Sequence, residues 1–540
     1  MAPDVSHHWE EFYLGSRRFQ FIADNFGMPI DQVNFILGQV MALVLAYIFR
    51  VYCHPSRVSA TTRHWGSLVA GLGISYFCFG RQVLLALLLV VGCYVLMLLL
   101  PITLIHHMSL AASLTFLSTM HIQRQIYEDG AFVIDVTGPM MIIVQKATAL
   151  AYSLHDGLSG LKDEQLTPLQ RELVLRKKPS ALEYFSYMLN FHSVLAGPFF
   201  MFADYQDFIE GTHYAKRALD TTAATTSLDS NRNKSPTDLK TMDAQKTASR
   251  PEDEPDPTRV SLYKAGLSLI CAVVTVCILP NFPISFLTQP GYFKSSYLYK
   301  GMYIVAVTSF TRHVYYTAWL VGDGICNMSG MGFNGYNKDG SAKWDLVSNV
   351  DVVGVETGLS LRDTLEAWNS GTMKWLRFMV YERAGAQKTL FTYMLSSMWH
   401  GFYPGYYITF VSGAFFTIAA RYVRRSVRPR VMSHGPVVKL AYDAVTCITT
   451  RLCLAFFTFP FILLRFWSSI AVYRDIYFIP AVLGVLVIVL LPIVLPPPSR
   501  SSSSAKSSAE KLKPSVKLED AGVNVTNGLE GGATKLLKVQ

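Results

Sequence analysis

This sequence contains several long stretches without a single charged side chain. The four clearest cover residues 83–105, 265–293, 389–420 and 476–495, none of which contains Asp, Glu, Lys or Arg. A helix needs about 20 apolar residues to cross the hydrocarbon core of a bilayer. Hydrophobic residues make up 51% of the chain and charged residues 16%, whereas soluble domains carry about 25% charged residues. The sequence therefore predicts an all-α integral membrane protein.

Further apolar stretches are shorter or carry a few polar residues. With the four clear runs they predict about 11 membrane elements in a polytopic transmembrane helical bundle. These weaker candidates are 33–52, 66–80, 102–120, 139–154, 184–203, 299–321 and 440–466.

Polar segments divide the chain into parts. Residues 1–32 form a polar N-terminal segment without a cleavable signal peptide, so the first membrane helix would direct insertion. Residues 33–495 form the transmembrane domain, within which residues 213–260 are expected to be a disordered insertion. Residues 496–540 are expected to be a disordered basic tail. Neither disordered segment has enough large apolar side chains to offset the entropy of ordering.

The basic residues indicate an orientation. The formal net charge is +10, and residues 421–439 hold six basic and no acidic residues. Positively charged loops stay cytosolic, which predicts that this loop and the C-terminal tail face the cytosol. Two crossings, near 440–466 and 476–495, would connect them. A nucleic acid partner is not expected in so apolar a chain. The eight cysteines include no CxxC pair, and neither a disulfide framework nor a metal site is expected.

One histidine occupies an unusual position. His400 lies in LSSMWHGFYPGYYITF, inside the longest uncharged run. Ionisable groups at membrane depth are costly, so a functional role is the first hypothesis. Gly401 and Pro404 follow it and would interrupt a helix, and irregular backbone at this depth must face protein or a polar cavity. The alternative is a structural histidine bonded to a neighbouring helix.

A second segment mixes aromatic and basic residues. The stretch LSLRDTLEAWNSGTMKWLRFMVYER, which contains Asn369, carries tryptophans and basic residues near helical spacing. This pattern is typical of an amphipathic helix at a membrane surface, and an ordinary interfacial helix remains the alternative. Candidate substrate contacts in this segment and beside His400 are Arg362, Trp368, Lys374, Trp375, Arg377 and Trp399, with the basic residues placed to meet phosphate groups.

The chemistry of acyl transfer connects the two segments. Transfer from a thioester to an alcohol needs a base for the hydroxyl proton, and an imidazole with a pKa near 6.5 suits that task. It also needs a donor for the developing oxyanion or an orienting group, which a carboxamide supplies without adding charge. No acidic partner lies near His400 in its own run, so a serine–histidine–aspartate triad is not indicated.

At these residues the chain resembles the membrane-bound O-acyltransferases, in particular the lysophospholipid acyltransferase branch and its first two vertebrate members. The likeness covers most of the chain between about residues 28 and 495. The similar segments are MPIDQVNF (28–35), GPMMIIVQKATALAYSLHDGL (138–158), PSALEYFSYMLNFHSVLAGPF (179–199), WDLVSNVDVVGVETGLSLRDTLEAWNSGTMKWLR (344–377), LSSMWHGFYPGYYITFVSGAF (395–415) and YDAVT (442–446).

The resemblance implies both a fold and an activity. It implies a helical bundle around a catalytic chamber, with His400 as general base and Asn369 as its supporting residue. Acyl-CoA would be a co-substrate rather than a cofactor, entering from the cytosol. The acceptor would be a lysophosphatidylethanolamine, lysophosphatidylserine or lysophosphatidylcholine in the bilayer. The acyl group is expected to be unsaturated, such as oleoyl, and the location is expected to be the endoplasmic reticulum membrane. His192 stands where relatives tend to have an apolar residue, and packing is the favoured interpretation.

Two other functions stay open from the sequence. One is a member of the same superfamily that acylates a protein or a neutral lipid. The other is a lipid transporter or scramblase without enzymatic activity, although few charged residues lie in the predicted spans to form an ion relay.

Overall fold

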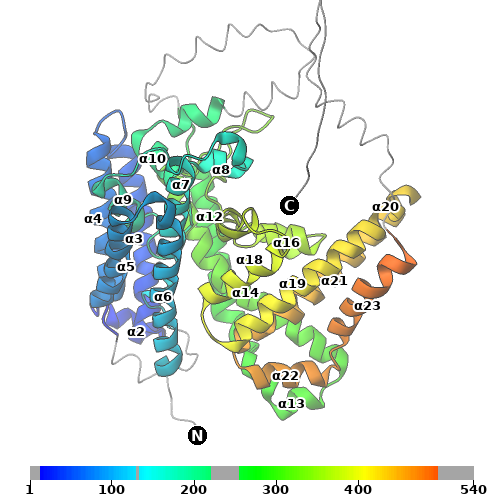
Figure 1. The fold of residues 1–540 in the computed structure, drawn as a ribbon. Helices are drawn as coiled ribbons and strands as arrows, with labels where there is room; N and C mark the ends of the chain where they lie inside the picture. Colours follow the sequence, from blue (N-terminus) through cyan, green and yellow to red (C-terminus); the bar gives the residue numbers. More distant parts are fainter. Residues whose placement is uncertain (1–12, 129–132, 220–253, 497–540) are drawn as a thin grey trace, which may run out of the picture.

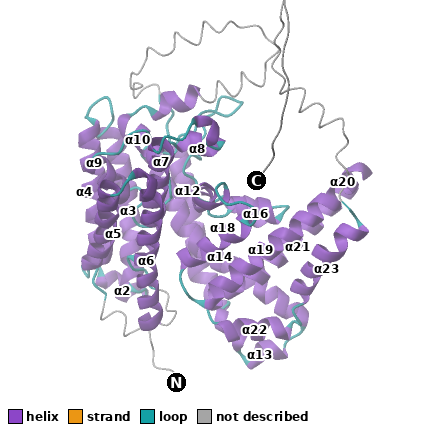
Figure 2. Ribbon diagram, viewed as in Figure 1, coloured by secondary structure: helices purple, strands orange, loops and turns teal. Residues whose placement is uncertain are grey.

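The computed structural model describes residues 13–128, 133–219 and 254–496. Within these ranges the regular elements are helices, apart from one bridge between Tyr336 and Ala342 (Figure 2). The all-α prediction is therefore confirmed. Most of the predicted insertion and almost the whole tail lie outside the described residues. The edges of the insertion are described and packed: the Arg50 guanidinium pairs with the Asp256 carboxylate at 2.7 Å.

The N-terminal half is a bundle of roughly upright helices, blue to cyan in Figure 1. In it, α4 packs against α3 and α9, and α6 packs against α5 and α7. The bundle consists of α2 (Gln20–Phe26), α3 (Ile30–Tyr52), α4 (Ala60–Phe79), α5 (Val83–Leu99), α6 (Ile102–Glu128), α7 (Thr137–Leu158), α8 (Pro168–Leu173), α9 (Ala181–Leu189) and α10 (Phe202–Glu210).

The C-terminal half spreads away from this bundle (Figure 1). Its long helix α14 packs against α12, α3 and α21, so it joins the two halves. The helices are α12 (Thr258–Val273), α13 (Pro290–Lys294), α14 (Tyr297–Met328), α15 (Val352–Thr357), α16 (Leu361–Ala367), α17 (Ser370–Leu376), α18 (Lys388–His400), α19 (Pro404–Ser426), α20 (Arg428–Val431), α21 (Pro436–Leu463), α22 (Phe466–Asp475) and α23 (Ile479–Val494). Short 3-10 or π turns are η1 (Gly80–Gln82), η2 (Asp163–Gln165), η4 (Val274–Ile278), η5 (Leu279–Asn281), η6 (Ile284–Thr288), η7 (Arg377–Tyr381) and η8 (Met432–His434).

Proline and glycine divide two of the uncharged runs. The 83–105 run ends a helix at Leu99, because Pro101 holds Leu100 in an extended conformation. The 389–420 run is divided between α18 and α19 at Gly401, whose φ is +118°. Both runs were predicted to hold at least one membrane element. In the structure the 83–105 run contributes to α5 and α6, and the 389–420 run contributes to α18 and α19.

The predicted element at 184–203 is not a membrane helix. Helix α9 ends at Leu189 after nine residues, which span about 14 Å, well short of the roughly 30 Å hydrocarbon core. The amide of Asn190 bonds back to the Tyr187 carbonyl, and its oxygen accepts bonds from Ser193. Such local side-chain bonds compete with helix continuation. Hydrophobicity alone could not reveal this ending.

The count of about 11 membrane elements is not confirmed. Five helices in the described residues are long and apolar enough to cross a membrane, or six if the pair α22–α23, bent by 77°, is one broken span. The five stretches are Ile30–Tyr52, Ala60–Leu99, Ile102–Tyr127, Thr258–Thr288 and Pro436–Leu463.

The end of α23 returns to the neighbourhood of α20. The Arg430 guanidinium donates to the Pro496 carbonyl at 2.9 Å, so the basic segment and the start of the tail lie at one end of the molecule. This agrees with the prediction that both are on the same side of the membrane. The cytosolic assignment of that side stays a prediction.

Candidate active site

His400 is the last residue of α18, and its imidazole lies among aromatic rings. It stacks on Phe410 with ring centroids 5.2 Å apart and meets the edge of Phe461 at 5.1 Å. Within the described part of the chain, no other residue forms a hydrogen bond with this imidazole, and the side chain is partly exposed. Both ring nitrogens therefore remain available to a ligand.

The backbone directly after His400 allows a second histidine to approach. His121 on α6 donates from Nε2 to the Trp399 carbonyl at 3.1 Å. A Cβ on Gly401 would lie 3.1 Å from Cγ of His121, a tight contact, and the φ of +118° independently favours glycine at this position. The last carbonyls of a helix lack intrahelical partners, and His121 caps one of them. Sequence reasoning missed His121, which directly follows the predicted 102–120 stretch and has polar neighbours such as Gln123 and Arg124, so no local signal marked it.

Asn369 lies at a break between two short helices. Its φ of 49° and ψ of 52° are left-handed, and it precedes the first residue of α17. The prediction of one continuous amphipathic helix is therefore wrong. The segment instead consists of α16, the break at Asn369, α17 and the π turn η7. Asn tolerates the left-handed region better than most residues, which explains how the break forms.

Several hydrogen bonds hold the main chain around Asn369, whereas none holds its side chain among the described residues. Ser370 N donates to the Asn349 carbonyl at 2.8 Å, and Gly371 N donates to Asn349 Oδ1 at 3.1 Å. The Asn369 carbonyl accepts from Met373 N at 3.0 Å. Among the described residues the Asn369 carboxamide has no hydrogen-bond partner, and the residue is half-buried. The backbone is thus held in place while the functional group stays free.

One face of α7 holds both helices that carry these residues. Trp399 Nε1 donates to the Met141 carbonyl at 3.0 Å, next to His400. Gln145 Nε2 donates to Thr372 Oγ1 at 2.8 Å, in the first turn of α17. Met141 and Gln145 are four residues apart, about 6 Å along the helix axis. The end of α18 and the start of α17 therefore lie about one helical turn apart along α7.

The two tryptophans on these helices are packing residues. Trp375 is fully buried and donates from Nε1 to Thr148 Oγ1 at 3.0 Å, and Trp399 is 4% exposed. Their ring centroids are 5.8 Å apart. Both were predicted as substrate contacts; the structure places Trp375 inside the core between α7 and α18.

The basic candidates lie on the outer side of the same segment. Arg362 pairs with Glu366 at 2.7 Å and Arg377 pairs with Glu382 at 2.9 Å, and both arginines are exposed. Lys374, on α17, is half-buried and forms no ion pair with a described residue. Of the three basic candidates, Lys374 is the one whose charge is available to a ligand, and it lies five residues after Asn369.

Trp368 belongs to a ring cluster rather than to an open surface. Its ring centroid lies 4.9 Å from Trp319, 5.7 Å from Tyr315 and 5.8 Å from Tyr316, all on α14. The residue next to Asn369 is thereby fixed against the long helix.

Another histidine is a packing residue, as expected. His192 is 1% exposed, stacks on Phe191 at 3.9 Å and meets the edges of Phe49 and Phe208. No group of three or more candidate metal ligands occurs among the residues that the structure describes. The candidate site predicted from the sequence is His400 and Asn369, and the contacts above describe the residues that hold them.

Comparison with known proteins defines the class. The model of MBOAT, the membrane-bound O-acyltransferase family, matches residues 124–466, which include His400 and Asn369. This chain belongs to the membrane-bound O-acyltransferase family and is a multi-pass membrane O-acyltransferase.

Several acyltransferases from other organisms are similar to this protein over most of the chain. Lysophospholipid acyltransferase 6 of Drosophila melanogaster is 41% identical over 89% of this chain, which spans 64% of the fly protein's length. Membrane-bound glycerophospholipid O-acyltransferase 1 of Mus musculus is 36% identical, over 89% of this chain and 93% of the mouse protein. Lysophospholipid acyltransferase of Schizosaccharomyces pombe is 32% identical over 66% of each chain. A purely non-enzymatic transporter is no longer a competing interpretation.

Proposed function

We propose that this protein transfers a fatty acyl group from acyl-CoA to the free hydroxyl of a lysophospholipid. The carrying observation is that the His400 imidazole and the Asn369 carboxamide have no hydrogen-bond partner among the described residues, while α7 binds the end of α18 and the start of α17 about one helical turn apart. The similar proteins are named as lysophospholipid or glycerophospholipid acyltransferases, and this supports the acceptor class. The acceptors expected from the sequence are the ethanolamine, serine and choline lysophospholipids, with an unsaturated acyl group such as oleoyl.

In the proposed reaction His400 acts as general base. Its neutral imidazole takes the proton of the lysolipid hydroxyl as the hydroxyl oxygen attacks the thioester carbonyl carbon. The tetrahedral intermediate collapses, the carbon–sulfur bond breaks, and the imidazolium returns its proton to the CoA thiolate. The aromatic rings of Phe410 and Phe461 make one side of His400 apolar, which favours transfer to the lysolipid hydroxyl over hydrolysis of the thioester.

Asn369 supports the same step without carrying charge. Its free carboxamide donates a hydrogen bond to the oxyanion or holds the reacting groups in line. Lys374, on the helix that Asn369 precedes, is suited to contact a phosphate of the donor. The catalytic chamber, the endoplasmic reticulum membrane and the cytosolic C-terminus belong to the same proposal.

The proposal is tested with a matrix of lysolipids and acyl-CoAs. Purified protein in nanodiscs is supplied with each pair, and the phospholipid product is measured by mass spectrometry. H400A is expected to lose about 10²- to 10⁴-fold in kcat, whereas H434A, which removes an exposed histidine, keeps wild-type activity. Wild-type transfer by H400A would contradict the assigned base. Transfer to a neutral lipid or a peptide but to no lysophospholipid would contradict the acceptor.

A further inference from the structure

Residues 349–370 form a compact lobe that contains Asn369 near its C-terminal end and is here called the Asn369 lobe. Two backbone bonds close its base: Ser370 N donates to the Asn349 carbonyl at 2.8 Å, and Asp351 N donates to the Ala367 carbonyl at 3.0 Å. Its helices α15 and α16 have six and seven residues. Helices this short are not stable alone in water, so the lobe depends on contacts with the rest of the protein.

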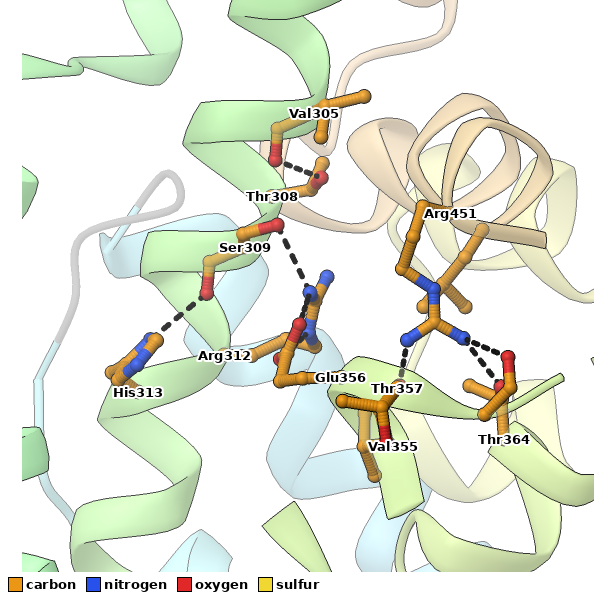
Figure 3. Close-up of polar contacts among 12 residues, drawn as sticks. Val305, Thr308, Ser309, Arg312, His313, Val355, Glu356, Thr357, Thr364 and Arg451 are labelled. Atoms are coloured by element: carbon orange, nitrogen blue, oxygen red, sulfur yellow. Dashed lines mark hydrogen bonds and ion pairs between the residues drawn. The ribbon is translucent and has the colours of Figure 1, made fainter. Parts of the chain in front are cut away.

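A charged pair attaches one side of the lobe to α14. Arg312 donates to Glu356 through Nε at 2.8 Å and Nη2 at 2.6 Å, in the bidentate arrangement seen in Figure 3. Tyr316 OH donates to the same carboxylate at 2.8 Å. The Arg312 side chain is only 11% exposed, so water screens this pair weakly.

Arg451 on α21 binds the other side of the lobe. It donates to the Val355 carbonyl, to the Gly358 carbonyl at 3.4 Å and to Thr364 Oγ1 at 2.5 Å (Figure 3). These acceptors belong to the C-terminal end of α15, the following turn and α16. One side chain thus fixes both short helices, and its charge suits the negative end of α15.

The contacts continue from Arg451 to Asn369. Thr364 accepts the guanidinium bond on its hydroxyl, and its carbonyl accepts from Trp368 N at 3.1 Å. Trp368 immediately precedes Asn369 and packs against Tyr316, which binds Glu356. The contacts of Arg451 and those of the Arg312–Glu356 pair therefore both lead to Trp368, the residue before Asn369.

We propose that Arg451 is a positioning residue for acyl transfer: with the Arg312–Glu356 pair it holds the Asn369 lobe so that the Asn369 carboxamide stays aligned with His400. The inference rests on the proposed role of Asn369. A left-handed residue persists only where its surroundings impose it, and Arg451 supplies part of that constraint from α21. Arg451 itself does not touch substrate.

The test compares R451Q with R451K and with the matched control R425Q, which removes an exposed arginine from α19. R451Q is expected to lose about tenfold to a hundredfold in kcat, the scale of a small misplacement of a catalytic group. Its KM values are expected to stay within about twofold of wild type, because substrate contacts remain. R451K is expected to recover part of kcat, since an ammonium offers donors without the planar fork.

Hydrogen exchange gives a readout that does not use activity. Backbone amides of residues 352–368 are expected to exchange faster in R451Q than in wild type, and at wild-type rates in R425Q. E356Q, which breaks the pair with Arg312, is expected to act in the same direction and serves if R451Q does not fold.

The outcomes separate this inference from the proposed function. If both R451Q and E356Q had wild-type kcat, or if both had wild-type exchange rates, the inference would be overturned. The proposed function would be unaffected, because it is tested by comparing wild type with H400A. Raised KM with unchanged kcat would also overturn it, because that result marks a substrate contact. Absence of acyl transfer by the wild-type protein would overturn the proposed function, and the inference with it.

Discussion

The indole rings of Trp375 and Trp399 lie 5.8 Å apart, and each donates its N–H to α7. Trp399 precedes the candidate base, and Trp375 is six residues after Asn369. This pair therefore sets the spacing between the helices that present the two candidate catalytic groups.

The first prediction concerns Trp375. W375A should leave a large cavity and lower the free energy of unfolding by about 3–5 kcal/mol. W375F should lower it by about 1 kcal/mol through the lost hydrogen bond, with a further loss from imperfect packing. The two variants should therefore show separate melting temperatures in detergent, measured by intrinsic fluorescence. Equal melting temperatures for W375A and wild type would show that this indole does not support the core.

The second prediction separates the side chain of Asn369 from its backbone. N369G keeps the left-handed conformation available but removes the carboxamide, so kcat should fall about 10²- to 10³-fold with little change in melting temperature. N369A removes the same group and adds about 1–2 kcal/mol of backbone strain. Steady-state kinetics and thermal unfolding of both variants provide the check. If N369G retained wild-type kcat, the carboxamide would have no role in catalysis.

The third prediction concerns Gly401. G401A forces a side chain into a φ of +118° and places a Cβ 3.1 Å from Cγ of His121. The free energy of unfolding is expected to fall by about 1–3 kcal/mol, and activity is expected to fall as well, because the end of α18 must shift. G385A is the matched control, since a Cβ there meets no atom of the described residues within 4 Å. Similar stability and activity for G401A and G385A would refute the close approach.

The fourth prediction concerns His121. H121F removes the donor to the Trp399 carbonyl but keeps most of the ring volume, so kcat should fall about tenfold while KM stays near wild type. H121N keeps a short donor and should retain more activity than H121F. The kcat and KM of both variants, with melting temperatures, check this. A fall in melting temperature without any fall in kcat would limit His121 to a structural role.

Several helices follow the apolar stretches of the sequence. The predicted elements at 33–52, 139–154 and 440–466 lie within or largely overlap α3, α7 and α21. The 184–203 element was wrong, because Asn190 and Ser193 satisfy the end of α9 through side-chain bonds that hydrophobicity does not report. His400 could be selected as a candidate because an ionisable group stood out in an uncharged run. Asn369 could be selected only through the family resemblance.

The sequence by itself determined that this protein resides in a membrane and that His400 is unusual. Both follow from the free energy of transfer between water and hydrocarbon, which depends on composition over a short stretch of chain. Only the tertiary structure decided how the site is assembled. His121 meets Trp399 across 278 residues, and Arg451 meets Thr364 across 87. Contacts between residues so distant depend on how whole helices pack, because no local pattern encodes which side chains then meet.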